Sequence, residues 1–132
     1  MALYSLIYAS QPFAFDDAML NGILLDARRV NIRDDITGAL ICLADVYLQL
    51  LEGPNAAVLA AYERIGMDDR HAGARALVSE DVDDRMFGKW AMLDDPARSW
   101  MWSQEQVAKG AVEAASRPEI IAVFDRLRAE TQ

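Results

Sequence analysis

Apolar side chains along the chain fall into two kinds of pattern, which predict alternating strands and helices. Five segments are rich in β-branched, aromatic and aliphatic residues and have the length of strands: residues 3–10, 36–43, 46–52, 73–80 and 86–93. Only Ala44-Asp45 separates the second segment from the third, which predicts a hairpin. Gly53-Pro54 ends the third strand, because proline cannot continue a sheet ladder.

Helical spacing of apolar residues occurs between and after these strands. One helix is predicted to begin at Asp16 or Asp17, either of which is a suitable cap, and to end near Asn31. A second is predicted from Asn55 to about Ile65, and two more over 104–115 and 118–130. The inward-facing positions form one stripe on each of the first two helices: Leu20, Ile23, Leu24 and Ala27 on the first, and Val58, Leu59, Tyr62 and Ile65 on the second.

The order strand-helix-strand-strand-helix-strand-strand predicts an α+β fold, a ferredoxin-like sandwich with both helices on one face of the sheet. Two additional C-terminal helices follow it. We expect the first and third strands to be central, adjacent and parallel. We expect the C-terminal helices to cover the other face of the sheet or to mediate self-association.

Three polar residues interrupt these apolar patterns. Gln49 lies in the most apolar strand, where an unpaired buried amide costs about 1–3 kcal/mol. Either Gln49 faces solvent on an edge strand, or it lies in the sheet beside Tyr8 of the neighbouring strand. Tyr8 alone is compatible with an ordinary core tyrosine, and Asn31 with the last residue of a helix. Together the three predict a polar cluster in an apolar cleft between two helices, a usual place for a flat ligand.

Other polar residues offer less chemistry. Arg28, Arg29 and Arg33 surround Asn31 and are compatible with a solvated helix end or with contacts to a phosphate. The motifs of phosphate-binding loops, zinc peptidases and serine hydrolases are absent from the sequence. No nucleophile–base pair is evident either, so we do not expect an enzyme.

Composition and charge exclude several classes of protein. The chain has 132 residues, 53% hydrophobic and 26% charged, which fits one globular domain. A single cysteine, Cys42, and a single histidine argue against a disulfide framework and a metal site. The net charge of −8 argues against direct binding to nucleic acid. No apolar run is long enough for a membrane span, and the N-terminal residues lack the basic start of a secretion signal, so we expect a cytoplasmic protein.

Five motifs, in order, resemble the BLUF domain, a family of blue-light sensors that use FAD. The resemblance covers about residues 3–95. The motifs are Tyr8-Ala9-Ser10, Asn31-Ile32-Arg33-Asp34-Asp35-Ile36-Thr37-Gly38, Tyr47-Leu48-Gln49-Leu50-Leu51-Glu52-Gly53-Pro54, Asp69-Arg70-His71 and Arg85-Met86-Phe87-Gly88-Lys89-Trp90-Ala91-Met92. The resemblance implies a flavin-binding photosensory domain over residues 1–95 and a C-terminal helical cap over 96–132.

The resemblance also implies a role for each residue of the predicted cluster. Tyr8 and Gln49 correspond to the photochemical pair, and Asn31 to the residue that binds the ring edge of the flavin. The remaining implied contacts to FAD are Arg70 and His71 beside the ring, and Arg28, Arg29 and Arg33 toward the ribityl phosphate.

The implied mechanism begins with light-driven transfer of an electron and a proton from Tyr8. This rearranges the hydrogen bonds of Gln49 to the flavin. The implied signalling residues are Ser10, Trp90 and Met92, which would pass the change through the last strand and the C-terminal helices. We expect a separate downstream protein partner and a homo-oligomer. The alternative is a ferredoxin-like module that binds flavin or another small molecule without photochemistry.

Overall fold

The computed structural model describes residues 3–12, 17–43, 46–66, 71–88, 90, 92–96 and 100–131. Its elements follow the predicted order through the fourth strand. They are β1 (Leu3–Pro12), α1 (Asp17–Asp34), β2 (Thr37–Leu43), β3 (Val46–Gly53), α2 (Asn55–Gly66), β4 (His71–Val82), β5 (Leu93–Pro96), α3 (Gln104–Ala108), α4 (Ala111–Ala114) and α5 (Arg117–Thr131).

The strands form one sheet in the order β4-β1-β3-β2-β5, with β1 and β3 adjacent at its centre. These two strands are antiparallel, so the parallel pairing expected from the sequence is wrong. The crossover through α1 makes β1 and β2 run in the same direction, and β3 returns between them as the hairpin partner of β2. A strand inserted in this way must run against both neighbours. The predicted α+β ferredoxin-like class is confirmed.

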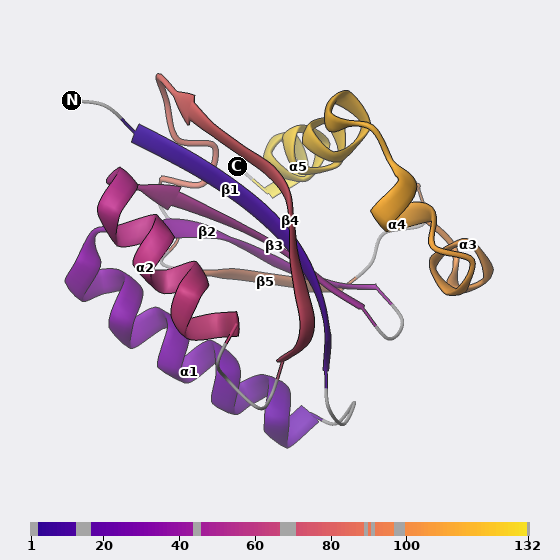
Figure 1. The fold of residues 1–132 in the computed structure, drawn as a ribbon, viewed down its shortest axis with the longest axis horizontal. Coiled ribbons are helices and arrows are strands. Elements are labelled where there is room, and N and C mark those ends of the chain that lie inside the picture. The colour runs from indigo at the N-terminus through magenta and orange to yellow at the C-terminus, as the bar shows by residue number, and fades with distance from the viewer. Residues whose placement is uncertain are drawn as a thin grey trace.

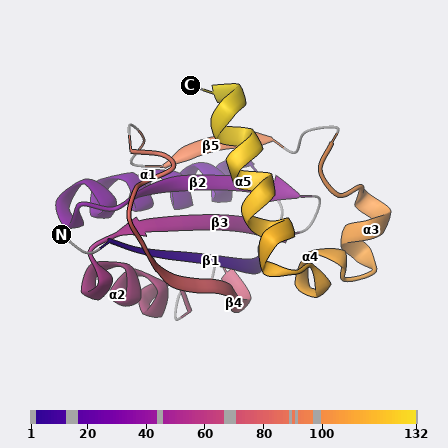
Figure 2. The same ribbon diagram turned by 90° about the horizontal axis from the view of Figure 1, so that it is seen from above.

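Helices cover both faces of the sheet (Figures 1 and 2). On one face, Ile23 and Leu24 of α1 and Val58 of α2 pack with the side chains of alternate strand residues such as Leu6 and Leu40. The opposite face forms a second apolar cluster, which includes residues of α5. Figure 2 shows α5 crossing this face. The last C-terminal helix, α5, therefore covers the far side of the sheet, one of the two expected arrangements.

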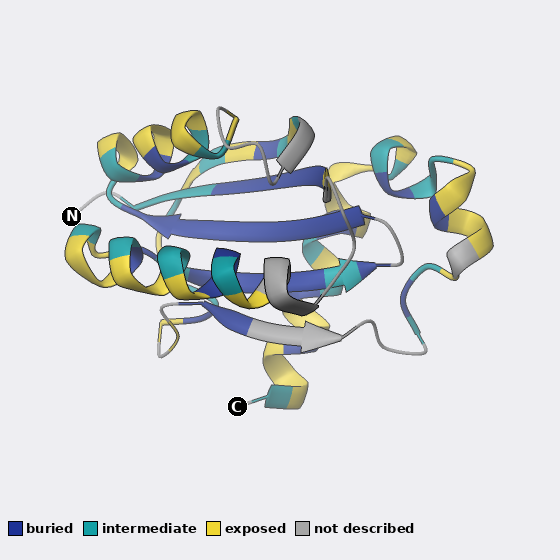
Figure 3. Ribbon diagram, turned by 90° about the horizontal axis from the view of Figure 1, so that it is seen from below, coloured by how far each residue is buried: buried dark blue, intermediate teal, exposed yellow. Residues whose placement is uncertain are grey.

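The burial pattern explains why the strands are so apolar. Every position of β3 is buried, because helices cover the sheet on both sides. Figure 3, seen from the side of α1 and α2, shows the central strands buried while the two helices expose one face each. In the described parts of the chain, no helix combines the length and apolar character needed to cross a bilayer.

The last predicted strand is only partly correct. Residues 83–88 form bends and a turn, and the fifth strand begins at Leu93, where it pairs in parallel with Ala39 of β2. The backbone N–H groups of Met86 and Phe87 donate to the carboxylate of Glu52 and not to a strand. The side chain of Glu52, and not a neighbouring strand, therefore accepts the hydrogen bonds of these two backbone N–H groups.

Three helical expectations need correction. The helix predicted over 104–115 is two short helices, because Gly110 adopts a left-handed conformation with φ of 83° between them. The described residues after β5 therefore form three helices and not two. In α2, Leu59 is 42% exposed, and Ala61 occupies the inward position instead. The first helix also extends past Asn31 to Asp34.

Candidate functional site

A cleft lies between α1 and α2 above β3, with a volume of about 170 Å³. Most of its lining is apolar, and two amides, Asn31 and Gln49, interrupt it. Two charged residues, Asp26 and Arg64, also border it. The complete lining is Ile23, Asp26, Ala27, Val30, Asn31, Gln49, Leu51, Ala61, Arg64 and Ile65.

Tyr8 and Gln49 form a buried pair beneath this cleft. They are register partners in β1 and β3, and each side chain is at most 2% exposed. The Tyr8 hydroxyl donates a hydrogen bond to Oε1 of Gln49. Gln49 is therefore not on a solvent-facing edge strand, and Tyr8 is more than a core tyrosine filling space.

The other end of the Gln49 amide contacts Met92. Its Nε2 donates to Sδ of Met92 at 3.3 Å, and Met92 is 2% exposed. Trp90, the other predicted residue of this segment, is 37% exposed. Of the two, Met92 is the inward one. Ser10, the third predicted signalling residue, is buried and lies opposite Tyr47 of β3.

Asn31 joins the site from α1. Its side chain is 3% exposed and lines the cleft with Gln49. Its backbone carbonyl accepts a hydrogen bond from the N–H of Ile36 at 2.9 Å, which fixes the junction between α1 and β2. The structure thus brings together the three residues of the predicted polar cluster: Tyr8, Asn31 and Gln49.

The arginines predicted to contact a phosphate do not line the cleft. Arg28 donates from Nε and Nη2 to the carbonyl of Met92, at 3.2 and 3.1 Å. Arg29 and Arg33 are exposed and pair with Asp26 and Asp34, respectively.

Two other predicted cofactor contacts have no described side chain. Arg70 lies outside the described residues, and so does the side chain of His71. The arginine that does border the cleft is Arg64, which the sequence analysis missed. The sequence offered no clear signal for it, because Ala61, one turn earlier on the same face, was not among the predicted inward positions.

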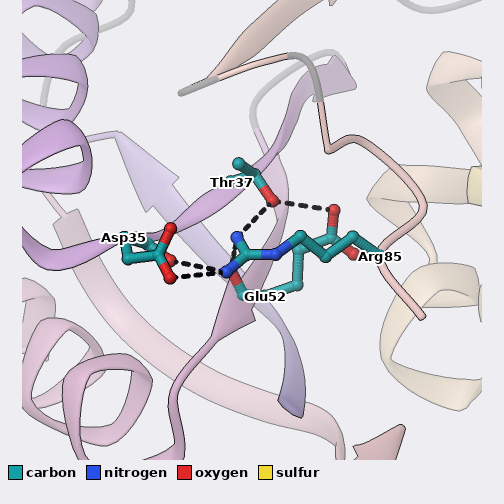
Figure 4. A network of polar contacts seen from close by, with 4 residues as sticks. All are labelled: Asp35, Thr37, Glu52 and Arg85. Atoms are coloured by element: carbon teal, nitrogen blue, oxygen red, sulfur yellow. Dashed lines mark hydrogen bonds and ion pairs between the residues drawn. The ribbon is translucent and has the colours of Figure 1, made fainter. Parts of the chain in front are cut away.

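A second polar cluster, also missed, lies at the C-terminal end of β3. We call it the Glu52 network: Asp35, Thr37, Glu52 and Arg85 (Figure 4). Glu52 is 1% exposed and accepts from the Thr37 hydroxyl at 3.1 Å. Arg85 donates to that hydroxyl at 2.9 Å and pairs with the Asp35 carboxylate at 3.1 Å. The sequence offered only a glutamate before Gly53-Pro54, which resembles the polar end of any strand.

Comparison with known proteins relates the chain to one family. It matches the BLUF family, sensors of blue light using FAD, over residues 3–93. It is 36% identical over 58 residues to the photoactivated adenylate cyclase subunit alpha of Euglena gracilis, covering 44% of this chain and 6% of the relative. It is 38% identical over 66 residues to the blue light- and temperature-regulated antirepressor BluF of Escherichia coli strain K12, covering 50% of this chain and 16% of the relative.

A solved structure resembles the chain along its whole length. The dark-state structure of BlrB, a BLUF protein, superposes with a TM-score of 0.76 at 27% identity and covers 97% of this chain and 96% of that one. The two curated relatives are much longer proteins, and the chain spans only 6% and 16% of their lengths. The family model describes sensors of blue light using FAD, and the Euglena relative is named as a subunit of a photoactivated adenylate cyclase. This chain belongs to the BLUF family of flavin-using blue-light sensors.

Proposed function

We propose that this chain binds FAD in the cleft between α1 and α2, and that Tyr8 and Gln49 are its photochemical pair. The observation that carries the proposal is the hydrogen bond from the Tyr8 hydroxyl to the amide of Gln49, a residue that also lines the cleft. A tyrosine and an amide joined in this way, away from water, form a path for a proton.

The chemistry of the cleft suits a flavin. The edge of the flavin ring carries both a donor and acceptors, and a carboxamide offers both a donor and an acceptor. Asn31 and Gln49 supply two carboxamides within an apolar surface. Clefts that enclose a drug-sized ligand measure about 300–1,000 Å³. The cleft, at about 170 Å³, is smaller than this range, so it would enclose only part of a FAD molecule and leave the rest at the surface.

The chain's own residues would do the following. A bound flavin would supply a light-activated oxidant in the cleft that Gln49 lines. Tyr8 holds a transferable proton on its hydroxyl, directed at Oε1 of Gln49. Nε2 of the same amide donates to Met92. Because an amide has a donor end and an acceptor end, reversing it removes the donor from Met92 and gives Tyr8 an N–H partner.

We propose that the outcome passes from Met92 through β5 and the C-terminal helices to a separate protein partner, in a homo-oligomer. Two contacts support the first step: the Nε2–Sδ hydrogen bond and the two bonds from Arg28 to the Met92 carbonyl. Met92 directly precedes β5, which lies at the edge of the sheet. A rearrangement of the Gln49 hydrogen bonds would therefore alter the position of Met92 and of the edge strand β5 that follows it.

An absorption spectrum before and after blue light tests the photochemistry. We expect a yellow protein whose spectrum shifts to the red and recovers in the dark. Tyr8→Phe should abolish the shift and retain the flavin. Tyr62→Phe is the matched control, because the Tyr62 ring lies 5.5 Å from the Tyr8 ring and its hydroxyl donates to the Ala74 carbonyl instead. A Tyr8→Phe protein with a normal photocycle would overturn the assignment.

The choice of FAD over FMN needs its own measurement. The proposal for FAD follows the family description, and Arg64 at the border of the cleft is suited to a diphosphate. Chromatography of the flavin released by heat should show FAD. Release of FMN or riboflavin alone would leave the photochemical pair in place and refute the choice of cofactor.

A further inference from the structure

Glu52 lies on the opposite face of β3 from Gln49. Side chains alternate along a strand, so Gln49 and Leu51 face α1 and α2 while Leu50 and Glu52 face the other side. Leu50 belongs to the apolar cluster that includes α5, in agreement with this alternation. Glu52 is thus a carboxylate at 1% exposure on the α5 side of the sheet.

The contacts of this carboxylate hold the segment after β4. Oε1 accepts from the N–H of Phe87 at 2.6 Å and from the Thr37 hydroxyl at 3.1 Å, and Oε2 accepts from the N–H of Met86 at 2.8 Å. Arg85 donates to the Glu52 carbonyl at 3.2 Å. Hydrogen bonds to a carboxylate are stronger than those between neutral groups. Glu52 therefore fixes the backbone of this turn.

The fixed turn carries a ring that contacts α5. The side chain of Phe87 is fully buried and packs edge-on against Phe124 of α5, with ring centroids 6.4 Å apart and planes at 82°. The same segment continues to the site: the N–H of Trp90 donates to the Phe87 carbonyl, and Met92 accepts from Gln49. Phe87 therefore contacts α5, and Met92, five residues later, contacts Gln49.

We propose that Glu52 is a positioning residue that couples Gln49 to α5, by holding Phe87 against Phe124 when the contact between Gln49 and Met92 changes. The proposal rests on the proposed photochemistry. If Glu52 holds Phe87, movement of Met92 must strain or shift the ring contact with α5. If Glu52 did not hold the turn at Met86 and Phe87, the same movement would be absorbed by the turn and would not reach Phe124.

The experiment compares two readouts in the flavin-loaded full chain. One is the red shift on illumination. The other is the lit-to-dark ratio, which is the rate of amide hydrogen exchange over residues 117–131 under illumination divided by the rate in the dark. Glu52→Gln keeps the shape of the side chain but replaces one acceptor oxygen with an NH₂ group, which cannot accept from a backbone N–H. We expect a normal red shift and a lit-to-dark ratio reduced by about twofold or more. Glu63→Gln, at an exposed carboxylate of α2, is the matched control and should behave as the parent.

Each outcome decides something. If Glu52→Gln shows a normal red shift and the same lit-to-dark exchange ratio in α5 as the parent, the coupling is overturned and the photochemistry stands. A parent protein that shows the red shift without any change in α5 amide exchange would also overturn the coupling and not the photochemistry. A parent without a red shift would overturn the proposed function and the coupling with it. If Glu52→Gln fails to fold, Phe87→Leu retains the carboxylate and weakens only the ring contact, and the same loss of α5 response is expected.

Discussion

Tyr8 and Gln49 lie directly opposite each other in the antiparallel register of β1 and β3. Opposite residues have Cβ atoms about 4.5–5.5 Å apart and point to the same face. A slip of one residue would send either side chain to the face covered by α5. The contact between the tyrosine and the amide is therefore set by the pairing of the two central strands.

The first prediction separates Met92 from Trp90. Met92→Leu removes the sulfur that accepts from Gln49 at nearly unchanged volume, so the fold should be retained at a cost below about 1.5 kcal/mol. Loss of one weak hydrogen bond, about 0.5–1 kcal/mol, should change the dark-recovery rate by about two- to fivefold. Trp90→Phe, at a 37% exposed side chain, should leave that rate unchanged. Flash-induced absorbance decay measures both, and a larger effect from Trp90→Phe would reverse the assignment.

The second prediction concerns the α5 contact. Phe124 is fully buried between α5 and the sheet, so Phe124→Ala should lower the free energy of unfolding by about 3–5 kcal/mol. Arg128→Ala on the same helix removes an exposed ion pair with Asp125 and should cost about 1 kcal/mol or less. Urea unfolding measures both variants. Equal losses would mean that α5 does not share the core of the sheet.

The sequence predicted the elements around the site well and their directions less well. Residues 3–10 and 46–52 were recognised as strands because buried strands carry runs of apolar residues. The expectation of parallel strands was wrong although the predicted order already implied the direction: the α1 crossover makes β1 and β2 run the same way, and the hairpin reverses β3 between them. Gln49 stood out as a polar residue in an apolar strand. Glu52 did not, because a glutamate beside Gly53-Pro54 resembles an ordinary polar strand end.

Residues 83–93 show a further limit of the sequence. The apolar and aromatic content of 86–93 predicted a strand, but the N–H groups of Met86 and Phe87 bond to Glu52. A side chain that is distant in sequence therefore decides the local backbone, and no local pattern records it. The inward position of Met92 over Trp90 has the same origin, since both side chains are apolar enough for either place.

The third prediction uses the left-handed backbone at Asp35, where φ is 60°. Asp35→Gly and Asp35→Ala both lose the carboxylate that pairs with Arg85 and keep the backbone carbonyl that Arg85 also contacts. They differ in the cost of this conformation, which glycine adopts freely and alanine does not. The glycine variant should therefore be more stable by about 1 kcal/mol. Thermal unfolding of the pair measures the difference, and an alanine variant of equal stability would contradict the conformational reason.

The fourth prediction concerns pH. The hydrogen bond from Arg117 at the start of α5 lowers the pKa of the Glu80 carboxyl of β4 below its ordinary value. The unfolded chain then binds the proton more readily than the folded one. This stabilisation is complete above the ordinary glutamate pKa, about 4.3. It is lost as pH falls through the lower pKa of the folded state.

Glu80→Gln should accordingly flatten the fall in stability on acidification, with little change in slope near neutral pH. Thermal unfolding at pH values from about 3 to 7 measures the slope across the range in which carboxylates titrate. Glu63→Gln alters the charge equally at an exposed position of α2 and serves as the control. An identical slope in Glu80→Gln and the parent would show that the pair with Arg117 does not form in solution.

The last prediction decides between two roles for Arg28. The family resemblance suggested a phosphate contact, whereas the guanidinium donates twice to the Met92 carbonyl. A phosphate contact predicts that Arg28→Gln weakens binding of FAD and spares riboflavin, which has no phosphate. A contact that positions Met92 predicts the same affinity ratio as the parent and a dark-recovery rate altered by about twofold or more. We expect the second result, and we expect the selective loss of FAD affinity in Arg64→Gln, because Arg64 borders the cleft and Arg28 does not. Selective loss in Arg28→Gln instead would assign Arg28 to the phosphate and would require it to leave Met92 when the cofactor binds.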